Sequence, residues 1–500
     1  MKKLILMLCM LLLLCSCVDG ATKIGLDRLN WSQQLPISDT VDVKSKIVVG
    51  NYYDYNAKLY DYITYNNSND IVTIQSALND AYNVSSGPIN SQKAIVELQP
   101  GFYQLAGSTT LTIPFGVTLS GAVDPSNAIC SAVDGWYKEG YNQGFATILV
   151  YNSVTPAITA YGLGCTISDL AFFYPLQKRN STPDVYPATI YANVGELHLK
   201  NIWAGNSYIF CDSTGVTSST NAYNIFGYPL KAGFIVDNGY SLTYYEKIKF
   251  HPGYMPGYMG VLPAGPNSAG IMAYTEDNGV GLDIRRSDAV VVSRCEISGY
   301  NVALKLTGTN DSTISQFYSE SVRPIWIEKT LNTKICNFDI STSIYTARPF
   351  THDANGITIV GPSIWATPET AAVISNGAIR LCQAHGVYID SVNPVMISNV
   401  FFDIFGLYTA SSSGVEIVSG YGHSVMDCNF FGIGQGDNGV VVRSPAQSCR
   451  VEGNNIQNCT YSTVWTDSVG SIIIGNRLFG QNVTGDAGTN TIANNRYTPV

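Results

Sequence analysis

Apolar and polar positions between residues 282 and 340 follow a pattern that occurs three times. Each copy opens with an alternating apolar triplet, and the copies begin 22 and 21 residues apart. Repetition at a fixed period of this size is typical of a solenoid, and the alternation is that of β-strands. The pattern therefore predicts stacked coils of short strands, a parallel β-helix. Its inward positions are Leu282, Ile284, Val292, Cys295 and Ile297, then Leu304, Leu306, Ile314, Phe317 and Ser319, then Ile325, Ile327, Ile335, Phe338 and Ile340.

The period changes to that of a helix over residues 70–82. Apolar side chains recur on one helical face, and Asp70 precedes them as a plausible N-cap. A helix laid across the open end of a solenoid covers unpaired strand edges. The pattern predicts an α-helix that caps the N-terminal end, with its apolar face formed by Ile71, Ile74, Ala77, Leu78 and Ala81.

The strand pattern returns towards the C-terminus with a looser period. Coil starts fall at Gly386, Gly414 and Gly439, and Asn454 and Asn476 occupy equivalent turn positions 22 residues apart. Stacked Asn side chains hydrogen-bond to one another along such a repeat, so we expect a structural ladder here. We predict a single all-β domain over residues 70–480, with residues 481–500 as a C-terminal cap or tail.

Three elements near the predicted helix resemble a known family. They are the strand at 94–98, the Pro-Gly turn with Phe102 and Tyr103, and the segment 116–121 with sequence Gly-Val-Thr-Leu-Ser-Gly. Together they resemble the N-terminal end of pectate-lyase-like, right-handed parallel β-helix proteins. That superfamily includes polysaccharide lyases, polygalacturonase-type glycoside hydrolases, epimerases and phage tailspikes. The catalytic signatures of its polygalacturonases and pectate lyases are absent from the sequence, so the resemblance implies the fold and no particular reaction.

The first 17 residues have the pattern of a targeting segment. Two lysines precede an apolar run too short to span a bilayer. The sequence Leu-Cys-Ser-Cys that ends at Cys17 resembles a bacterial lipoprotein signal, which implies lipid attached to Cys17. The alternatives are an ordinary secretory signal or an uncleaved anchor. We expect residues 18–69 to form a tether or arm with a short strand near Val48, and the protein to be at the cell envelope or surface, or secreted.

Charge and cysteine content exclude several classes of protein. The net charge is −9 with only 28 Lys and Arg, and no basic run occurs, which argues against nucleic-acid binding. Three of the 12 cysteines lie in the first 17 residues, and the remaining nine cannot all pair within the chain. Cys295 and Cys428 fall at inward positions, so we expect buried thiols. No metal-binding spacing is found, and the sequence leaves open whether Ca²⁺ binds and whether the solenoid forms a homotrimer.

Two stretches that interrupt the coils are candidate substrate sites. In the first, Tyr174, Gln177 and Tyr186 surround a polar insertion and resemble a YPxQ…YPxTI arrangement of some bacterial superfamily members. They would form a sugar-stacking wall with one amide donor, or the Tyr-Pro pairs simply shape two turns. The second follows Phe250, where His251 is a candidate for proton transfer and Tyr254 for substrate contact. A structural histidine is the alternative.

The densest charge cluster begins inside the repeat itself. Asp283 points outward because its neighbours point inward, and Arg285, Arg286 and Asp288 follow in the next turn. Glycoside hydrolysis needs two carboxyl groups, whereas β-elimination needs a base and a group that neutralises a uronate. Asp283 with Asp288, or Arg285 with a cation held by the acidic residues, would serve either scheme, and Arg286 would contact substrate. The alternative is a structural Arg–Asp pair that pins a coil turn.

Two functions remain from the sequence. The first is a surface-anchored carbohydrate-active enzyme that cleaves an extracellular polysaccharide by hydrolysis or β-elimination. Its partners would be the polysaccharide and, through the lipid only, a membrane. The second is a non-catalytic glycan-binding or adhesin-type solenoid, which would bind glycans without turnover.

Overall fold

The computed structural model describes most of the chain from residue 46 to residue 498. These residues belong to one compact unit, Lys44–Val500. The predicted leader and its lipidation site, Cys17, lie outside the described residues, so that assignment stays a prediction. Within 46–498 the segments not described are 52–61, 65–69, 85–93, 126–144, 179–180, 194, 216–217, 255–265, 343–353, 362–369, 406–411, 433–437, 460–461, 480–482 and 486–488.

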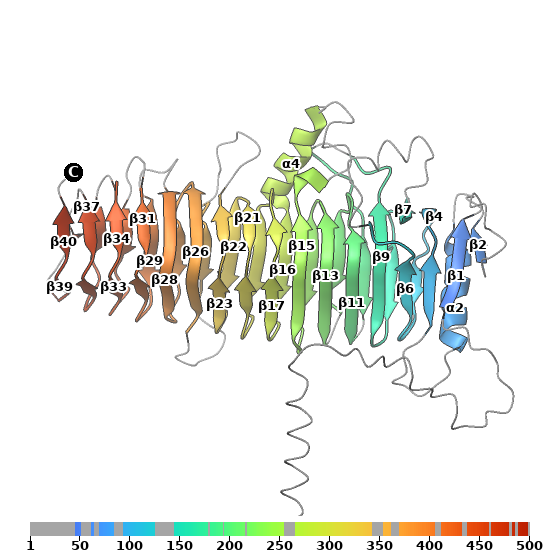
Figure 1. Cartoon of the computed structure of the whole chain (residues 1–500), viewed down its shortest axis with the longest axis horizontal. Helices are drawn as coiled ribbons and strands as arrows, with labels where there is room; N and C mark the ends of the chain where they lie inside the picture. Colours follow the sequence, from blue (N-terminus) through green and yellow to red (C-terminus); the bar gives the residue numbers. More distant parts are fainter. Residues whose placement is uncertain are drawn as a thin grey trace, which may run out of the picture. The chain divides into compact units, whose positions relative to one another are not determined.

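The strands of the described residues form two parallel sheets, as predicted (Figure 1). The 14-stranded sheet, here sheet B, contains β5 (Leu111–Ile113), β8 (Ile158–Tyr161), β10 (Ala188–Asn193), β12 (Ile209–Ser213), β14 (Ala232–Asp237), β16 (Val280–Arg285), β19 (Val302–Thr307), β22 (Arg323–Glu328), β25 (Ile357–Val360), β27 (Val387–Asp390), β29 (Ser413–Ser419), β32 (Asn438–Val442), β35 (Ser462–Thr466) and β38 (Val483–Gly485).

The second sheet, sheet A, has 26 strands among the described residues. They are β1 (Lys46–Asn51), β2 (Tyr62–Thr64), β3 (Ile95–Leu98), β4 (Gly101–Leu105), β6 (Thr118–Gly121), β7 (Ala146–Val150), β9 (Cys165–Phe173), β11 (Glu196–Trp203), β13 (Ser219–Gly227), β15 (Thr243–Phe250), β17 (Val290–Ser293), β18 (Glu296–Ile297), β20 (Thr313–Ser315), β21 (Tyr318–Glu320), β23 (Thr333–Cys336), β24 (Asp339–Ser341), β26 (Ala372–Cys382), β28 (Val395–Phe405), β30 (Ser424–Met426), β31 (Asn429–Phe431), β33 (Arg450–Glu452), β34 (Asn455–Gln457), β36 (Ile472–Ile474), β37 (Arg477–Phe479), β39 (Thr491–Ala493) and β40 (Arg496–Thr498).

One coil runs through a strand of sheet B, a turn, and then sheet A, which it crosses in two parts. In the central coil these are β16, β17 and β18, after which β19 begins the next coil. The register pairs Leu282 with Leu304 and Leu304 with Ile325, and pairs Val292 with Ile314. The period read from the sequence is therefore the coil length, and the predicted parallel β-helix is confirmed.

Sheet A bends at a residue with positive φ that recurs in each coil. Asn and Asp suit this left-handed conformation because their short polar side chains hydrogen-bond locally. Asn201 Nδ2 donates to Asp169 Oδ1 at 2.8 Å, and Asn224 Nδ2 donates to Asn201 Oδ1 at 2.9 Å. We call the column of these bend residues along sheet A the bend ladder. Its members at positive φ are Asp169, Asn201, Asn224, Lys247, Arg294, Gln316, Asn337, Asn376, Asn399, Asp427, Gly453, Gly475 and Asn494.

A second Asn ladder lies inside the C-terminal coils, as the sequence predicts. Asn454 Nδ2 donates to Asn476 Oδ1, and Asn476 Nδ2 donates to Asn495 Oδ1, each at 3.0 Å. Asn454 and Asn476 are fully buried. Their amides therefore hold neighbouring turns together in the core, which confirms their structural role.

Three helices lie among the described residues: α2 (Ile71–Val84), the short 3-10 helix η6 (Pro252–Tyr254) and α4 (Pro266–Asn278). Helix α2 buries the predicted apolar face, which packs in the main core beside the first coils. Its cap differs in detail from the prediction: the Asp70 carboxylate accepts a hydrogen bond from the backbone N–H of Gln104 at 2.8 Å. Burial raises the pKa of Asp70 to about 6. None of the described helices is long and apolar enough to cross a bilayer.

Glycines at the starts of the sheet B strands leave room for core aromatic rings. A Cβ on Gly414 would lie 2.4 Å from Phe430 Cδ1 and 2.8 Å from the carbonyl oxygen of Gly439. Gly386 has the same relation to Phe402. This explains why Gly-Val pairs mark the C-terminal coil starts.

We expect Gly414→Ala to lower the free energy of unfolding by about 1–3 kcal/mol, because the core must shift to admit the methyl group. Urea titration followed by circular dichroism measures the change. The control is Gly164→Ala, where a Cβ has nothing within 4 Å and only the positive φ of 70° is unfavourable. An equal loss in both variants would show that the Phe430 contact is not the cause.

Candidate functional site

The outer face of sheet B carries a row of side chains, one from each coil, most of which are aromatic or charged. The register aligns them, and successive strands lie about 4.8 Å apart. We call this the central row. From β12 to β35 its members are Asp212, Ile235, Asp283, Lys305, Trp326, Thr358, Tyr388, Glu416, Val441 and Trp465.

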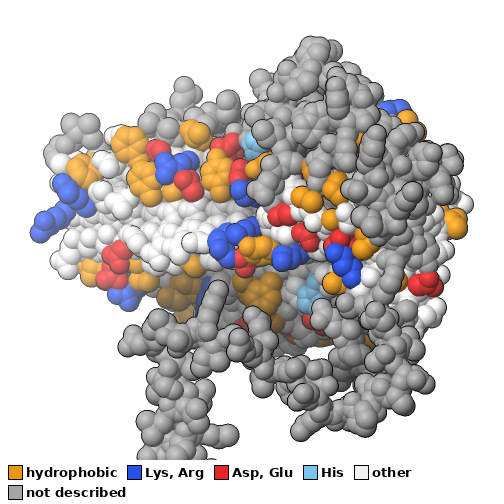
Figure 2. Space-filling view, turned by 45° about the vertical axis from the view of Figure 1, so that its right-hand side comes forward, with side chains coloured by type: hydrophobic (Ala, Val, Ile, Leu, Met, Phe, Trp, Pro, Cys, Tyr) orange, Lys and Arg blue, Asp and Glu red, His pale blue; other side chains and the backbone are white. Residues whose placement is uncertain are grey.

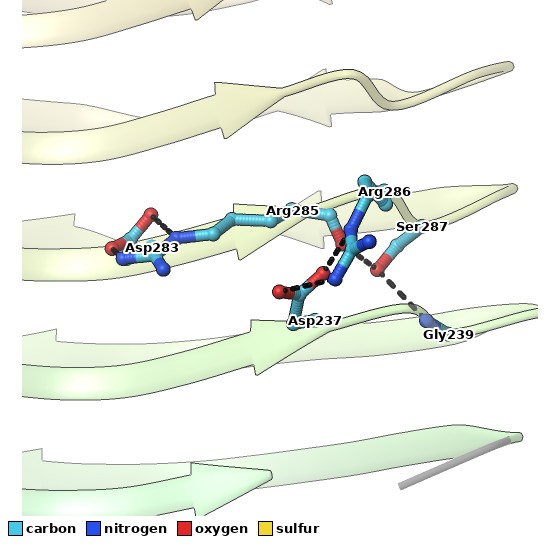
Figure 3. A network of polar contacts seen from close by, with 6 residues as sticks. All are labelled: Asp237, Gly239, Asp283, Arg285, Arg286 and Ser287. Carbon is cyan, nitrogen blue, oxygen red and sulfur yellow. Dashed lines mark hydrogen bonds and ion pairs between the residues drawn. The ribbon is translucent and has the colours of Figure 1, made fainter. Parts of the chain in front are cut away.

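Asp283 points outward as predicted but is covered by its own neighbour (Figure 3). Its side chain is only 9% exposed, because the Arg285 guanidinium folds back along β16. Arg285 Nε donates to Asp283 Oδ1 at 3.1 Å, and Nη2 contacts Oδ2. The hydrogen bond that Arg285 donates to Asp283 is the main cause that raises the pKa of Arg285. Both oxygens of this predicted catalytic carboxylate are therefore engaged by one arginine.

The turn after β16 joins two coils. Arg286 Nε and Nη2 donate to the two oxygens of Asp237 on β14 at 2.7 and 2.8 Å (Figure 3). Ser287 Oγ accepts a hydrogen bond from Gly239 N–H at 3.3 Å. Asp288 lies beyond, in a bridge with Asn310. Asp283 is thus paired with Arg285 while Asp288 lies in the following turn, and Arg286 forms a structural Arg–Asp pair of the kind that the sequence left as an alternative.

A second charged group lies further along the central row and was not expected from the sequence. Glu416, on β29, has a side chain only 7% exposed although it points out of the sheet. His385 Nε2 lies 2.7 Å from Glu416 Oε2, and Arg443 Nε contacts Oε1. His385 Nδ1 lies 2.9 Å from Ser413 Oγ. Because a carboxylate only accepts, Nε2 carries the proton and the ring is held between Ser413 and Glu416.

Aromatic rings lie near Glu416, and the carboxylate of Asp390 is on the neighbouring strand. The Arg443 guanidinium lies over the Trp465 ring at 5.3 Å, and the His385 and Tyr388 rings are 5.8 Å apart. The register of β27 with β29 shifts after Ile389, so that Asp390 comes opposite Ser419. Ser419 Oγ donates to Asp390 Oδ1 at 2.5 Å. Bulges of this kind occur next to active sites, where they redirect a side chain.

The Glu416 carboxylate is ionised at neutral pH. Burial acts to raise its pKa, but the hydrogen bonds and charges of His385 and Arg443 outweigh burial and lower the pKa below its ordinary value. An ionised carboxylate held rigidly beside aromatic rings is suited to act as a base, a nucleophile or a stabiliser of developing positive charge. It is not suited to act as a proton donor.

The lowered pKa predicts how stability depends on pH. A carboxylate with a depressed folded-state pKa stabilises the fold above its unfolded pKa, about 4.3, and this contribution is lost as the pH falls through the folded value. We therefore expect the difference in unfolding free energy between wild type and Glu416→Gln to be largest above pH 5 and to shrink below pH 4. Urea midpoints over this range measure it. A difference that does not change with pH would contradict the ionised assignment.

The first predicted substrate stretch lies in the core. Tyr174 is 1% exposed and Tyr186 is 5% exposed, and their rings meet edge to face at 4.8 Å. The Tyr174 hydroxyl forms a hydrogen bond with Thr189 Oγ1 at 2.7 Å. Gln177 is buried and exchanges two hydrogen bonds with the backbone of Asp184. The expected sugar-stacking wall is thus not formed by these side chains, which shape the turn as the alternative reading held.

His251 and Tyr254 lie at the other sheet. They follow β15 of sheet A, where His251 Nδ1 accepts a hydrogen bond from Gly253 N–H at 2.9 Å and the Tyr254 ring packs edge to face on Phe226. Burial lowers the pKa of His251, against the charges of Glu296 and Glu320. The acidic residues that act on His251 are therefore Glu296 and Glu320. His251 follows a strand of sheet A, whereas Asp283 lies on sheet B, so the two do not share a face.

Within the part of the chain that the structure describes, no group of three or more His, Cys, Asp and Glu side chains has the arrangement to hold a metal ion.

Comparison with known proteins places the chain by its fold alone. No family model and no curated protein matches the sequence. Among solved structures, DFA-IIIase from Arthrobacter chlorophenolicus A6 in complex with GF2 aligns at 13% identity and a TM-score of 0.43, over 89% of this chain and 98% of that one. The A-module of mannuronan C-5 epimerase AlgE6 from Azotobacter vinelandii aligns at 13% identity and a TM-score of 0.34, over 87% and 96%.

Scores and identities of this size assign no activity to the protein. The fold stands on the strand register described above, which confirms the expected parallel β-helix.

Proposed function

We propose that the protein is a carbohydrate-active enzyme that hydrolyses a polysaccharide on the outer face of sheet B, with Glu416 as its catalytic carboxylate. The observation that carries the proposal is the burial of an ionised Glu416 on a face where side chains should be exposed. His385 and Arg443 fix its two oxygens, so the carboxylate is oriented before substrate arrives. Such pre-organisation is characteristic of catalytic groups.

The surroundings of Glu416 supply the other parts that hydrolysis requires. Asp390 lies on β27, the strand that pairs with the strand of Glu416, and we assign it the role of proton donor to the leaving oxygen. Tyr388 is next to Glu416 in the central row and Trp465 lies two strands away, beyond Val441, and both rings offer faces on which sugar rings stack. His385 and Arg443 are positioning residues, because they act through Glu416.

Hydrolysis fits this site better than β-elimination. Elimination needs a base together with a free cation that neutralises the uronate carboxylate. Arg443 and His385 are both engaged by Glu416, whereas hydrolysis uses an ionised carboxylate as it stands. The alternative is a glycan-binding protein, which would bind the glycan at the same surface without cleaving it.

A panel of purified polysaccharides tests the proposal. Reducing ends measure cleavage of either kind, and ultraviolet absorbance measures the unsaturated product of β-elimination. Hydrolysis predicts new reducing ends without a rise in absorbance. A parallel rise in both would identify a lyase, and retention of a glycan with neither signal would establish the binding protein.

A further inference from the structure

The bend ladder of sheet A is interrupted at three successive coils. Lys247, Arg294 and Gln316 occupy positions that hold Asn or Asp in the coils on either side, and all three keep the positive φ of the ladder. Long side chains lack the local hydrogen bonds that favour Asn in this conformation. Strained backbone of this kind persists where the side chain serves a purpose beyond the fold.

The two cations lie beside a tyrosine and a third cation. Lys247 Nζ donates to Tyr223 Oη at 2.7 Å, and the register places Lys200 directly next to Tyr223. Arg294 contacts the carboxylate of Glu246, which follows Tyr223 in the same row. The group thus combines three cations with one anion, in a protein whose net charge is −9. Figure 2 shows Lys and Arg side chains in the middle of the view, with Asp, Glu and hydrophobic side chains among them.

The tyrosine responds to this local positive charge. The hydrogen bond from Lys247 is the main cause that lowers the pKa of Tyr223, and the charges of Lys247, Arg294 and Lys200 act in the same direction. Tyr244, 43% exposed, lies one strand away on the same face, two residues before Glu246. Two phenol rings therefore stand next to a cluster of donors for an acidic group.

We propose that Lys200, Tyr223, Lys247 and Arg294 form a second binding surface, separate from sheet B, for an acidic polysaccharide. Its carboxylate or sulfate groups would be held by the lysines and the arginine, which match such groups in charge and donor geometry. The sugar ring would lie against Tyr223 and Tyr244. An open strand face with rings next to cations suits a polymer that passes over it, and the patch is too small for a nucleic-acid footprint.

Replacing the two cations of the bend ladder by asparagine tests the proposed binding surface. In the double variant Lys247→Asn and Arg294→Asn, both bends receive the residue that suits them, so the unfolding midpoint should not fall. Affinity electrophoresis in gels that contain polygalacturonate, dextran sulfate or neutral dextran measures binding. We expect the wild type to be retarded by one or both acidic polymers and not by dextran. The double variant should bind about tenfold more weakly.

The control removes a charge from the same sheet away from the patch. Lys334 is exposed on β23, and Lys334→Asn should bind like the wild type. Equal retardation of wild type and double variant would overturn the proposal, as would an equal loss in the control. Binding to phosphatidylglycerol vesicles without retardation by either acidic polymer would identify a membrane contact instead, and would also overturn it. The two acidic gels distinguish carboxylate from sulfate as the bound group.

Discussion

Glu416→Gln should abolish most of the polysaccharide hydrolysis, with a fall in kcat of about 10²–10⁴. Glutamine has nearly the same shape, and its amide oxygen still accepts a hydrogen bond from Arg443 or His385. It carries no charge, so it neither attacks, nor removes a proton, nor stabilises positive charge on the sugar. Because His385 and Arg443 then lack their anion, we also expect a small loss of stability. Reducing-end assays on the polysaccharide that the wild type cleaves measure the change.

The matched control is Glu452→Gln. Glu452 lies on β33 of sheet A and is bonded to Arg450, so it is a Glu–Arg pair on the other sheet. This variant should keep the wild-type rate. Activity that survives in Glu416→Gln, or falls equally in both variants, would remove Glu416 from the catalytic role.

His385→Asn should lower kcat less than Glu416→Gln and shift the pH profile, because a positioning residue acts through the carboxylate.

Asn476→Ala should lower the free energy of unfolding by about 3–5 kcal/mol, because each buried polar group left without a partner costs about 1–3 kcal/mol. Asn476 Oδ1 accepts hydrogen bonds from the backbone N–H and Nδ2 of Asn454, and its own Nδ2 donates to the carbonyl of Val451, each at 3.0 Å. The methyl group of alanine satisfies none of these groups, and water has no access to them.

Asn429→Ala is the comparison, since Asn429 is exposed and accepts one bond, from Asn455 Nδ2 at 3.2 Å. It should change the free energy of unfolding by less than about 0.5 kcal/mol. Urea denaturation measures both variants. A small effect for Asn476→Ala would mean that the turn relaxes to pair the exposed groups, and would contradict the ladder as a source of stability.

The central coils could be predicted in register because their period is nearly constant. Leu282, Leu304 and Ile325 are one coil apart in the sequence and paired in the sheet. Alternation with period two then placed the inward residues of the repeat, and the change to helical spacing placed α2. Buried asparagines could also be assigned, because Asn454 and Asn476 recur at the coil length.

The candidate site could not be predicted in the same way. His385, Glu416 and Arg443 come from three successive coils of the looser C-terminal region, so nothing in the sequence places them together. The only signal was the outward position of Glu416 after Gly414-Val415. The outward position of Asp283 was predicted correctly, but the fold-back of Arg285 over it depends on side-chain conformation.

Helix α4 was also missed, for a different physical reason. Its sequence from Pro266 to Asn278 has no clear apolar face. Contacts with distant residues hold it: the hydroxyls of Tyr208 and Tyr274 are 2.9 Å apart, and Thr275 Oγ1 donates to the carbonyl of Gly299 at 2.8 Å. Tertiary contacts of this kind decide a helix that local propensity does not.

The inward cysteines allow the opening of individual coils to be measured by thiol chemistry. The cysteines that the structure describes are free, so the stacked coils hold together without covalent cross-links and should be equally stable in oxidising and reducing surroundings. Burial raises the pKa of the thiols of Cys295, Cys382 and Cys428 to about 12. Each thiol is inert while its coil is closed. The rate at which each one reacts with a thiol reagent therefore reports how often that part of the solenoid opens, so the protein carries its own set of local-unfolding probes.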